Sequence, residues 1–382
     1  MLQKGSINLY TLKQKGMESM QVNFVTIHDP RHQGYVKYKL DHILIIIMAA
    51  VLCGLDELCT ITEFANNKAE FFRKNFGIES IPSKPTFSRI LSIIDGKEVA
   101  TAILEIMKEK VTGREEIIAI DGKAICSTTQ KNKSHSALQI ISAYLTESGV
   151  ILGQEKINNK TNEIPVLQEM LSYLNVENKI ITADAMHCQR ETCKIITEKK
   201  GDYVIGLKAN QKALYEDVKL YFENPPADFK PEIYTTKEKS HGRIEKRVCK
   251  KVSEISWLKE RHNWVGLESV FSIERTITEG KGTSKETSYY ISSKNVSAEK
   301  LLNIAREHWK IESLHWLLDV VFNEDESKYA SENAHITLNA MRKLALLKHK
   351  SYLSDKKKKP SLKGNMFKAL LNEKLLLEII SA

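Results

Sequence analysis

Hydrophobic residues recur at helical spacing over the first third of the chain, after an irregular segment at 1–35. Their spacing predicts a helix over 40–54 and a second over 62–75, and a Ser/Pro-rich start opens a third over 82–91. Three short helices with basic starts are typical of a helix-turn-helix-like DNA-binding module. A helical cap packed on a catalytic core explains the pattern equally well. We therefore expect a helical domain over 36–112 and leave DNA binding by it as one of two alternatives.

The spacing changes from helical to strand-like at residue 117. Apolar runs of strand length alternate there with amphipathic stretches, and turn residues separate them. Three antiparallel strands followed by helix, strand, helix and strand is the order of an RNase H-like α/β sheet. The predicted strands are 117–121, 138–146, 150–157, 179–183 and 202–207, and the predicted helices are 165–174 and 189–199.

A different pattern occupies 224–295, where alternating apolar and polar residues predict a β-rich insertion. Helical spacing returns at Ser297, a residue type that caps helix N-termini. The predicted RNase H-like catalytic domain is therefore discontinuous, over 113–223 and 296–350. The segment 351–382 is predicted to be a basic tail with a run of four lysines and a terminal helix. The expected fold class is α/β, with an RNase H-like core, a β-rich insertion and an N-terminal helical domain.

The composition is that of a folded intracellular protein. Of 382 residues, 42% are hydrophobic and 27% are charged, which is ordinary for a globular protein rather than a disordered one. The longest apolar run, 43–55, is shorter than the roughly 20 residues that cross a bilayer, and 1–15 lacks the apolar segment of a signal peptide. We expect a cytoplasmic protein without a membrane partner. The net charge of +9 favours a polyanionic partner, although the lysine-rich composition of an A/T-rich genome would produce it equally well.

Three carboxylates are distinguished by their places in this pattern. Asp121 follows the apolar run 117–120, Asp184 follows 180–183, and Glu312 lies inside the late amphipathic helix. A carboxylate at a strand end weakens the strand and risks burying a charge. Divalent cations that join two such strand ends to a helical glutamate would offset this cost and form a two-metal phosphoryl-transfer site. We therefore predict a catalytic site with two Mg²⁺ or Mn²⁺ ions.

Each carboxylate taken alone has a simpler explanation. An Asp before Gly, as at Asp121, is commonly a turn residue, and a helical Glu is commonly solvated. On the late helix, Glu312 shares one face with His308, His315 and Asp319. This face has the spacing of a zinc site, but the His-Glu-x-x-His order of a helical zinc site is absent. The combination of the three carboxylates and their order along the chain carry the prediction.

Several linked motifs occur in a fixed order between residues 29 and 350. They are AIDGK at 119–123, KTNEIP at 160–165, TADAMHCQ at 182–189, DYVIGLKANQ at 202–211, HGRIEKR at 241–247, and HWKIE with LHWLLDV between 308 and 320. In these motifs the chain resembles the ISAs1-type transposases, also described as H-repeat-associated proteins, within the DDE transposase group related to the IS4 type. The resemblance begins after Met17 and Met20, so either methionine is an alternative start.

The resemblance implies an RNase H-like core in which Asp121, Asp184 and Glu312 are catalytic and hold the metal ions. It also implies a β-rich insertion between the second Asp and the Glu. In the wider IS4 group the Glu lies in a Tyr-Arg-Glu-Lys motif. This chain instead has His308 four residues before Glu312 and Asp319 seven residues after it. The resemblance therefore leaves open which residues assist Glu312.

Polar and basic residues near the motifs are candidates for DNA binding. Those just beyond strand ends or on the late helix would hold phosphates; they are Lys123, Lys208, Asn210, Gln211 and Lys310. His241, Arg243 and Arg247 are spaced by even numbers, so they would lie on one side of a strand as a basic stripe. Solvated turn residues and a charged edge strand are the respective alternatives. Trp309 and Trp316 are predicted to pack in the interior rather than to stack on a base.

The function that the resemblance implies is that of a bacterial insertion-sequence transposase. Such an enzyme binds the inverted repeats at the ends of its element in double-stranded DNA, nicks them and joins the 3′ hydroxyls to target DNA. Because two ends are joined, we expect a homodimer or a larger assembly on DNA. Two rivals stay open: a DNA-binding relic that has lost transposition, and an RNase H-like nuclease that cuts without joining.

Overall fold

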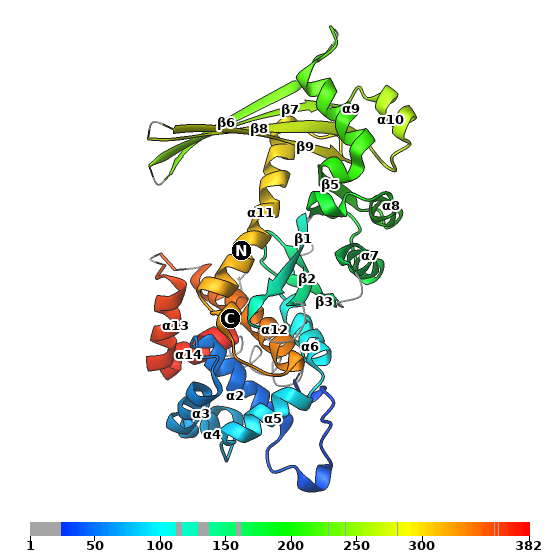
Figure 1. Cartoon of the computed structure of the whole chain (residues 1–382). Helices are drawn as coiled ribbons and strands as arrows, with labels where there is room; N and C mark the ends of the chain where they lie inside the picture. Colours follow the sequence, from blue (N-terminus) through cyan, green and yellow to red (C-terminus); the bar gives the residue numbers. More distant parts are fainter. Residues whose placement is uncertain are drawn as a thin grey trace, which may run out of the picture.

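The computed structural model describes residues 24–111, 117–128, 137–157, 162–227, 229–240, 242–280, 282–354, 356–357 and 359–382. Figure 1 shows an elongated molecule. Helices from the N-terminal and C-terminal parts of the chain gather at one end, and the strands of the insertion lie at the other. One long helix, α11 (Ala298–Val320), runs between them. The predicted fold class is confirmed, because an RNase H-like α/β core carries a β-rich insertion and N-terminal helices.

The N-terminal region consists of helices, one of which is apolar on all sides. They are α2 (Leu40–Leu52), α3 (Leu58–Asn67), α4 (Ala69–Phe76), α5 (Lys84–Ile93) and α6 (Gly96–Lys108). Every residue of α2 from Ile43 to Leu52 is buried, as expected for a helix that is hydrophobic on all sides. The single helix predicted over 62–75 is wrong, because Lys68 leaves the helical conformation and separates α3 from α4. Helix α6 was not predicted from the sequence.

The core sheet has the predicted order of elements. Three antiparallel strands, β1 (Ile117–Ile125), β2 (Leu138–Leu145) and β3 (Ile151–Ile157), precede α7 (Glu163–Tyr173), β4 (Ile180–Ala183), α8 (Arg190–Glu198) and β5 (Asp202–Leu207). In space the strands follow the order β3-β2-β1-β4-β5, with β4 parallel to both β1 and β5. All four residues of β4 are buried, as expected for a central parallel strand covered on both faces.

The insertion extends the core sheet instead of forming a separate sheet. It follows α9 (Lys212–Glu223) and consists of β6 (Glu232–Ser240), β7 (Arg243–Val252), α10 (Ser256–His262), β8 (Ser269–Glu279) and β9 (Gly282–Ser292). β9 pairs antiparallel with β5 through four residue pairs, from Val204–Ser292 to Leu207–Tyr289. The result is a nine-stranded sheet that ends at β6. Alternating spacing predicted these strands, but the pairing of β9 with β5 depends on contacts between distant segments.

Of the late helices, α11 connects the two ends of the molecule, and the helices after it lie at the helical end. The Ser297 side chain accepts a hydrogen bond from the Lys300 amide and so caps α11, as predicted. After α11 come the 3₁₀ turn η5 (Glu324–Glu326), α12 (Glu332–Ser354), α13 (Leu362–Leu371) and α14 (Glu373–Ser381). The chain leaves the helical conformation at Asn372 between α13 and α14. Among the helices that the structure describes, none has the length and hydrophobicity to cross a membrane.

Helix α12 buries several charged side chains, and Lys343 is the clearest case. Its ammonium donates hydrogen bonds to Ser142 Oγ at 2.8 Å and to Gln154 Oε1 at 2.9 Å, and the side chain is 3% exposed. Burial lowers the pKa of Lys343 to about 7, and the nearby charge of Glu324 only partly opposes this. The folded protein therefore releases this proton at a lower pH than the unfolded chain does.

We expect the variant Lys343→Met to gain stability relative to the wild type at neutral pH, and this gain to shrink as pH rises. Between about pH 7 and the ordinary pKa of lysine, 10.5, the unfolded chain holds a proton that the folded wild type lacks, so wild-type stability increases with pH. The expected slope is roughly 1 kcal/mol per pH unit. Urea unfolding of both proteins at pH 7, 8 and 9 measures the difference. A difference that stayed constant or grew with pH would contradict the assignment.

Candidate active site

Two of the three predicted carboxylates lie at the point where two parallel strands separate. The parallel pairing of β1 with β4 ends at Ile120 and Ala183, so Asp121 and Asp184 follow it at the same level of the sheet. The prediction that Asp121 ends its strand is wrong, because β1 continues to Ile125 paired with β2. Asp184 does end β4, and there the chain turns into the 3₁₀ turn η3 (Ala185–His187).

Helix α11 carries the third carboxylate, and two histidines of the same helix contact the two aspartates. His308 Nε2 lies 3.5 Å from Asp184 Oδ1, and its Nδ1 lies 3.2 Å from Thr182 Oγ1. His315 Nδ1 lies 3.5 Å from Asp121 Oδ2. Glu312 lies between these histidines, four residues after the first and three before the second, on the same face of the helix. The predicted shared face is therefore the face that α11 turns toward the two aspartates.

The charges of this group influence one another. Burial raises the pKa of Glu312, and the negative charges of Asp121 and Asp184 raise it further against the opposing effect of the two histidines. The hydrogen bond from His308 lowers the pKa of Asp184, and the charge of Lys208 contributes in the same direction. The side chain of Asp184 is 62% exposed, so solvent or a ligand can reach it. The site is thus a group of mutually repelling carboxylates that is open on one side.

These residues fit a divalent cation in chemistry but do not form a closed cage. Carboxylate oxygens are the ligands that Mg²⁺ and Mn²⁺ prefer, and the mutual repulsion that raises the pKa of Glu312 is what a cation would relieve. Among the described residues, no group of three or more His, Cys, Asp or Glu side chains is spaced to enclose a metal ion. Asp121, Asp184 and Glu312 are therefore candidate ligands of an open site, where water or substrate would complete the coordination.

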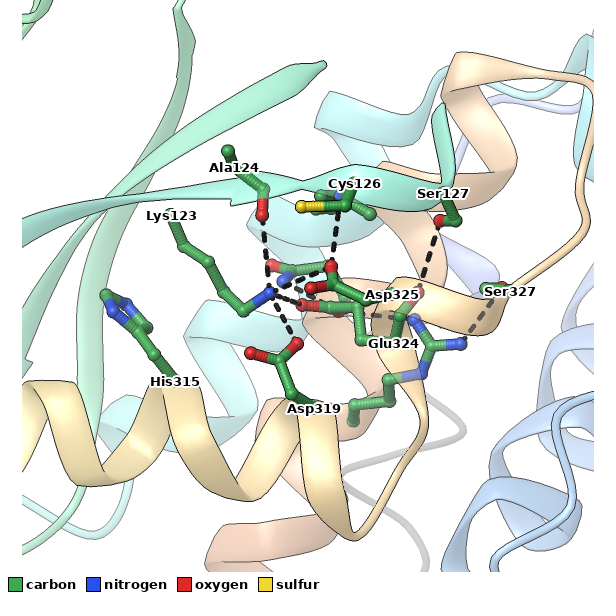
Figure 2. A network of polar contacts seen from close by, with 12 residues as sticks. Lys123, Ala124, Cys126, Ser127, His315, Asp319, Glu324, Asp325 and Ser327 are labelled. Atoms are coloured by element: carbon green, nitrogen blue, oxygen red, sulfur yellow. Dashed lines mark hydrogen bonds and ion pairs between the residues drawn. The ribbon is translucent and has the colours of Figure 1, made fainter. Parts of the chain in front are cut away.

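Lys123 is not placed to bind DNA phosphates, contrary to the prediction. Its side chain is 8% exposed, and its Nζ lies 2.7 Å from Asp319 Oδ1 and 3.4 Å from both Glu324 Oε2 and Asp325 Oδ1 (Figure 2). Side chains alternate along a strand, so Lys123 shares with Asp121 the face of β1 that α11 covers. The Lys123–Asp319 ion pair therefore joins β1 to α11 near the active site.

The same ion pair belongs to a buried network that reaches the N-terminal helices. Glu324 is fully buried and accepts hydrogen bonds from Asn339 Nδ2 at 3.0 Å and from Arg342 Nη1 at 3.2 Å. Arg342, also fully buried, lies 2.8 Å from Asp56 Oδ2 in the segment before α3. Burial alone would raise the pKa of Glu324, but the charges of Arg342 and Lys123 outweigh it and lower this pKa. The network fixes the C-terminal end of α11 relative to β1 and α12.

Asn210 and Gln211 hold the loop after Asp184 through their side-chain amides, and their predicted role in DNA binding stays a prediction. Asn210 Nδ2 donates to the Ala185 carbonyl at 2.7 Å, and Gln211 Nε2 donates to the Cys188 carbonyl at 2.9 Å. Lys208 beside them is exposed and stays a candidate for phosphate binding. On α11, Lys310 is also exposed, and its Nζ contacts Glu307 at 2.6 Å and the Thr146 carbonyl at 3.2 Å.

The predicted basic stripe forms one wall of a groove of about 410 Å³ between the insertion and α11. Arg243 and Arg247 of β7 line it together with Arg275 of β8 and Arg306 of α11, two arginines that the sequence reading missed. The arginines are partly neutralised, since Arg247 Nη2 lies 2.7 Å from Glu245 Oε1 and Arg306 Nη1 lies 2.8 Å from Glu238 Oε1. The third residue of the predicted stripe, His241, lies outside the described residues, as do Lys160 and Thr161 of the KTNEIP motif.

The two tryptophans of α11 are not buried, so the prediction of interior packing is wrong. Trp309 is 54% exposed and lines the groove, where the Arg275 guanidinium lies 5.8 Å from its ring centre. Trp316 is 59% exposed. The interior side of α11 is instead formed by smaller apolar residues such as Ile311 and Leu314. Trp309 is three residues from Glu312, so the groove adjoins the carboxylates.

Comparison with known proteins identifies the family. The sequence profile described as "Transposase DDE domain" matches residues 112–348, and a second profile, described as DDE_Tnp_1-associated, matches residues 22–107. The chain is 36% identical over 330 residues to "Putative transposase YncI" of Escherichia coli O157:H7, covering 84% of each chain. It is 32% identical over 379 residues to "H repeat-associated putative transposase YhhI" of Escherichia coli K12, covering 96% of this chain and 98% of the relative.

A solved piggyBac transposase synaptic complex with hairpin DNA superposes on 95% of this chain and 78% of that chain. Its TM-score of 0.44 at 12% identity is too low to bear on the fold. The family profile and the relatives decide the matter: the profile covers more than half of the chain, and relatives match along nearly all of it. The protein belongs to the family of DDE transposases, and its named relatives include H repeat-associated transposases.

Proposed function

We propose that this protein is the transposase of a bacterial insertion sequence, which binds the ends of its element in double-stranded DNA, cuts the strands and joins them to target DNA. The observation that carries this proposal is the convergence of Asp121, Asp184 and Glu312 where the parallel pairing of β1 with β4 stops. The family to which the chain belongs supports the same chemistry. We assign the three carboxylates as the catalytic residues.

The chain's own residues prepare this site for phosphoryl transfer. Asp121, Asp184 and Glu312 would hold two Mg²⁺ or Mn²⁺ ions, which when bound activate the attacking oxygen and stabilise charge on the leaving oxygen. His308, whose Nε2 lies 3.5 Å from Asp184 Oδ1, orients Asp184 and lowers its pKa, which favours the ionised form. His315 orients Asp121 in the same way, with its Nδ1 3.5 Å from Asp121 Oδ2. A positioned site of this kind needs little reorganisation during the reaction.

Both proposed steps are in-line displacements at phosphorus. In the cleavage step a water oxygen bonds to phosphorus, the bond to the 3′ oxygen breaks, and that oxygen leaves as a 3′ hydroxyl. In the joining step this 3′ hydroxyl oxygen bonds to a phosphorus of the target strand and displaces the 3′ oxygen of the neighbouring target nucleotide. The first step hydrolyses a phosphodiester to a 5′ phosphate and a 3′ hydroxyl, and the second step exchanges one phosphodiester for another. Neither step involves a redox change.

DNA would approach the carboxylates along the groove that the insertion forms with α11. Arg243 and Arg247 stay our candidates for backbone contacts there, and Arg275, which lines the same groove, joins them. Lys208 and Lys310 are candidates nearer the carboxylates. Basic residues along one wall supply attraction for phosphates without reading sequence. The N-terminal helices, 36–112, are the candidate for recognising the element ends.

Replacing both Arg243 and Arg275 by alanine should weaken binding to double-stranded DNA of any sequence. Each phosphate contact contributes about 0.9 to the slope of log affinity against log salt concentration, so this slope should fall by about 2. Lys246 of β7 and Lys285 of β9 provide a matched control, because both align with Thr276 of β8 on the opposite face of the sheet. Fluorescence anisotropy at several salt concentrations measures both double variants. Equal losses in the two would show that the groove has no special part in binding.

We further propose an oligomeric state and a set of domain boundaries. Joining two ends requires at least two protomers, so the active species is a homodimer or larger on DNA, acting in the cytoplasm. The proposed divisions are an N-terminal segment 1–35, a helical domain 36–112, a catalytic domain 113–223 with 296–350, an insertion 224–295 and a basic tail 351–382.

The test is metal-dependent processing of DNA that carries the sequence flanking this gene. The wild-type protein is incubated with end-labelled duplex and a target plasmid in Mg²⁺, and products are resolved on a denaturing gel. Cleavage followed by joined products is the expected result. Cleavage without joined products would favour a nuclease, and binding without cleavage would favour a relic. A protein that neither binds nor cuts this DNA would overturn the proposal.

A further inference from the structure

Glu163, the first residue of α7, is not one of the three proposed catalytic carboxylates, but its side chain lies against the backbone of Gly122, next to Asp121. Its carboxylate packs on Gly122 so closely that a Cβ added there would lie 2.5 Å from Glu163 Oε1. Only glycine allows this approach. The Glu163 side chain is 17% exposed, so most of it is removed from solvent. Gly122 therefore allows a fourth carboxylate to lie next to β1, the strand that carries Asp121.

A buried histidine connects Glu163 to the other catalytic strand. His187 Nε2 lies 3.1 Å from Glu163 Oε1, and the His187 side chain is fully buried. The His187 amide donates to the Asp184 carbonyl at 2.9 Å, and the imidazole contributes to lowering the pKa of Asp184. A carboxylate accepts hydrogen bonds, so Nε2 carries the proton in this contact. Glu163 is thus fixed from two directions, by the residue after Asp121 and by the turn after Asp184.

Glu163 and Glu312 approach the two aspartates from opposite faces of the sheet. Alternation along β1 turns Asp121 and Lys123 toward α11 and turns Gly122 toward α7. Beyond Ile120, β1 stays paired with β2. Beyond Ala183, β4 ends and the chain turns into η3, so β1 and β4 are no longer paired there. A side chain on the α7 face can reach the catalytic edge of β1 there without an intervening strand.

We propose that Glu163 is a fourth carboxylate of the catalytic centre, contributing an oxygen to divalent-cation binding, with His187 as its positioning residue. This inference rests on the function proposed above and assigns a further residue to the same site. Hard divalent cations take six or more oxygen ligands, so a triad alone leaves positions for a further carboxylate. The His187 hydrogen bond sets the orientation of Glu163, as partners behind metal ligands commonly do.

The experiment measures Mn²⁺ binding to the full chain without DNA, from the electron paramagnetic resonance signal of free Mn²⁺. Glu163→Gln keeps the size of the side chain but removes its charge, and we expect it to weaken Mn²⁺ binding by roughly 10- to 100-fold. Glu169→Gln, an exposed position on the same helix, is the matched control and should bind like the wild type. Equal Mn²⁺ affinity in both variants and the wild type would overturn the proposal.

Two further variants separate the possible causes. Gly122→Ala leaves every carboxylate in the chain but displaces Glu163, so it should also weaken Mn²⁺ binding; unchanged binding would count against the proposal. Circular dichroism and the unfolding midpoint verify that each variant is folded. Asp121→Asn reports on the proposed function itself: if Mn²⁺ binding does not depend on Asp121, that function fails. Dependence on Asp121 but not on Glu163 removes only the present inference.

Discussion

Replacing Asp121, Asp184 or Glu312 by the corresponding amide is expected to abolish DNA cleavage, with a rate at least roughly 10³-fold below wild type. The amide preserves the shape of the side chain but removes the negative charge that attracts a divalent cation. DNA binding should be retained, because the proposed phosphate contacts lie elsewhere, in the groove beside α11. Single-turnover cleavage in Mg²⁺ and DNA binding in Ca²⁺ measure the two properties separately.

Of these substitutions, Glu312→Gln should not destabilise the metal-free protein. The pKa of Glu312 is raised by burial and by the charges of Asp121 and Asp184, so the folded state carries a repulsion that Glu312→Gln removes. We expect an unfolding midpoint equal to or above that of the wild type. Glu299→Gln, in the first turn of α11, is the control and should cleave normally. Cleavage that survives Glu312→Gln would mean that the third carboxylate is a different residue.

The largest effect on stability is expected from Arg342→Met. Arg342 and Glu324 are both fully buried, and their ion pair spans 3.2 Å. Removing Arg342 leaves the Glu324 charge buried with Lys123, at 3.4 Å, as its remaining ion-pair partner, and breaking a buried pair in this way costs about 3–5 kcal/mol of the free energy of unfolding. Because Arg342 also pairs with Asp56 at 2.8 Å, the N-terminal helices lose an attachment to α12 in the same variant. Urea unfolding followed by circular dichroism measures the loss.

Two comparisons test the explanation. Arg73 pairs with Glu70 on the surface of α4 at 2.7 Å, and Arg73→Met should leave the urea midpoint unchanged within error. In the double variant Arg342→Met, Glu324→Gln, the buried charge is removed with its partner, so part of the lost stability should return. A double variant less stable than Arg342→Met would show that packing, rather than an unpaired charge, causes the loss.

Much of the core could be predicted from the sequence because its signals are local. Apolar runs such as 180–183, followed at once by a polar residue, predicted β4 and the position of Asp184 at its end. Helical spacing placed His308, Glu312 and His315 on one face of α11, which is the face turned toward the aspartates. Strand and helix periods depend on neighbouring residues only, so a single sequence contains them.

Other features were predicted incorrectly because they depend on what a residue meets in space. Lys123 follows a conspicuous Asp-Gly pair and was expected to bind phosphates, but Asp319, Glu324 and Asp325 surround it. Trp309 was expected inside because tryptophan is large and apolar, yet α11 turns it into the groove that Arg243, Arg247 and Arg275 of the sheet line. Neither partner set is near its residue in the chain.

The sequence by itself determined the order of strands and helices in the core, the three carboxylates and the family resemblance, since each follows from local spacing and local motifs. Only the tertiary structure decided which side chains meet. It joined β9 to β5, placed Glu163 on Gly122 and made Lys123 part of a buried ion network. These contacts join residues far apart in the chain, and they are selected by the packing and charge balance of the whole fold. No short segment of sequence contains that information.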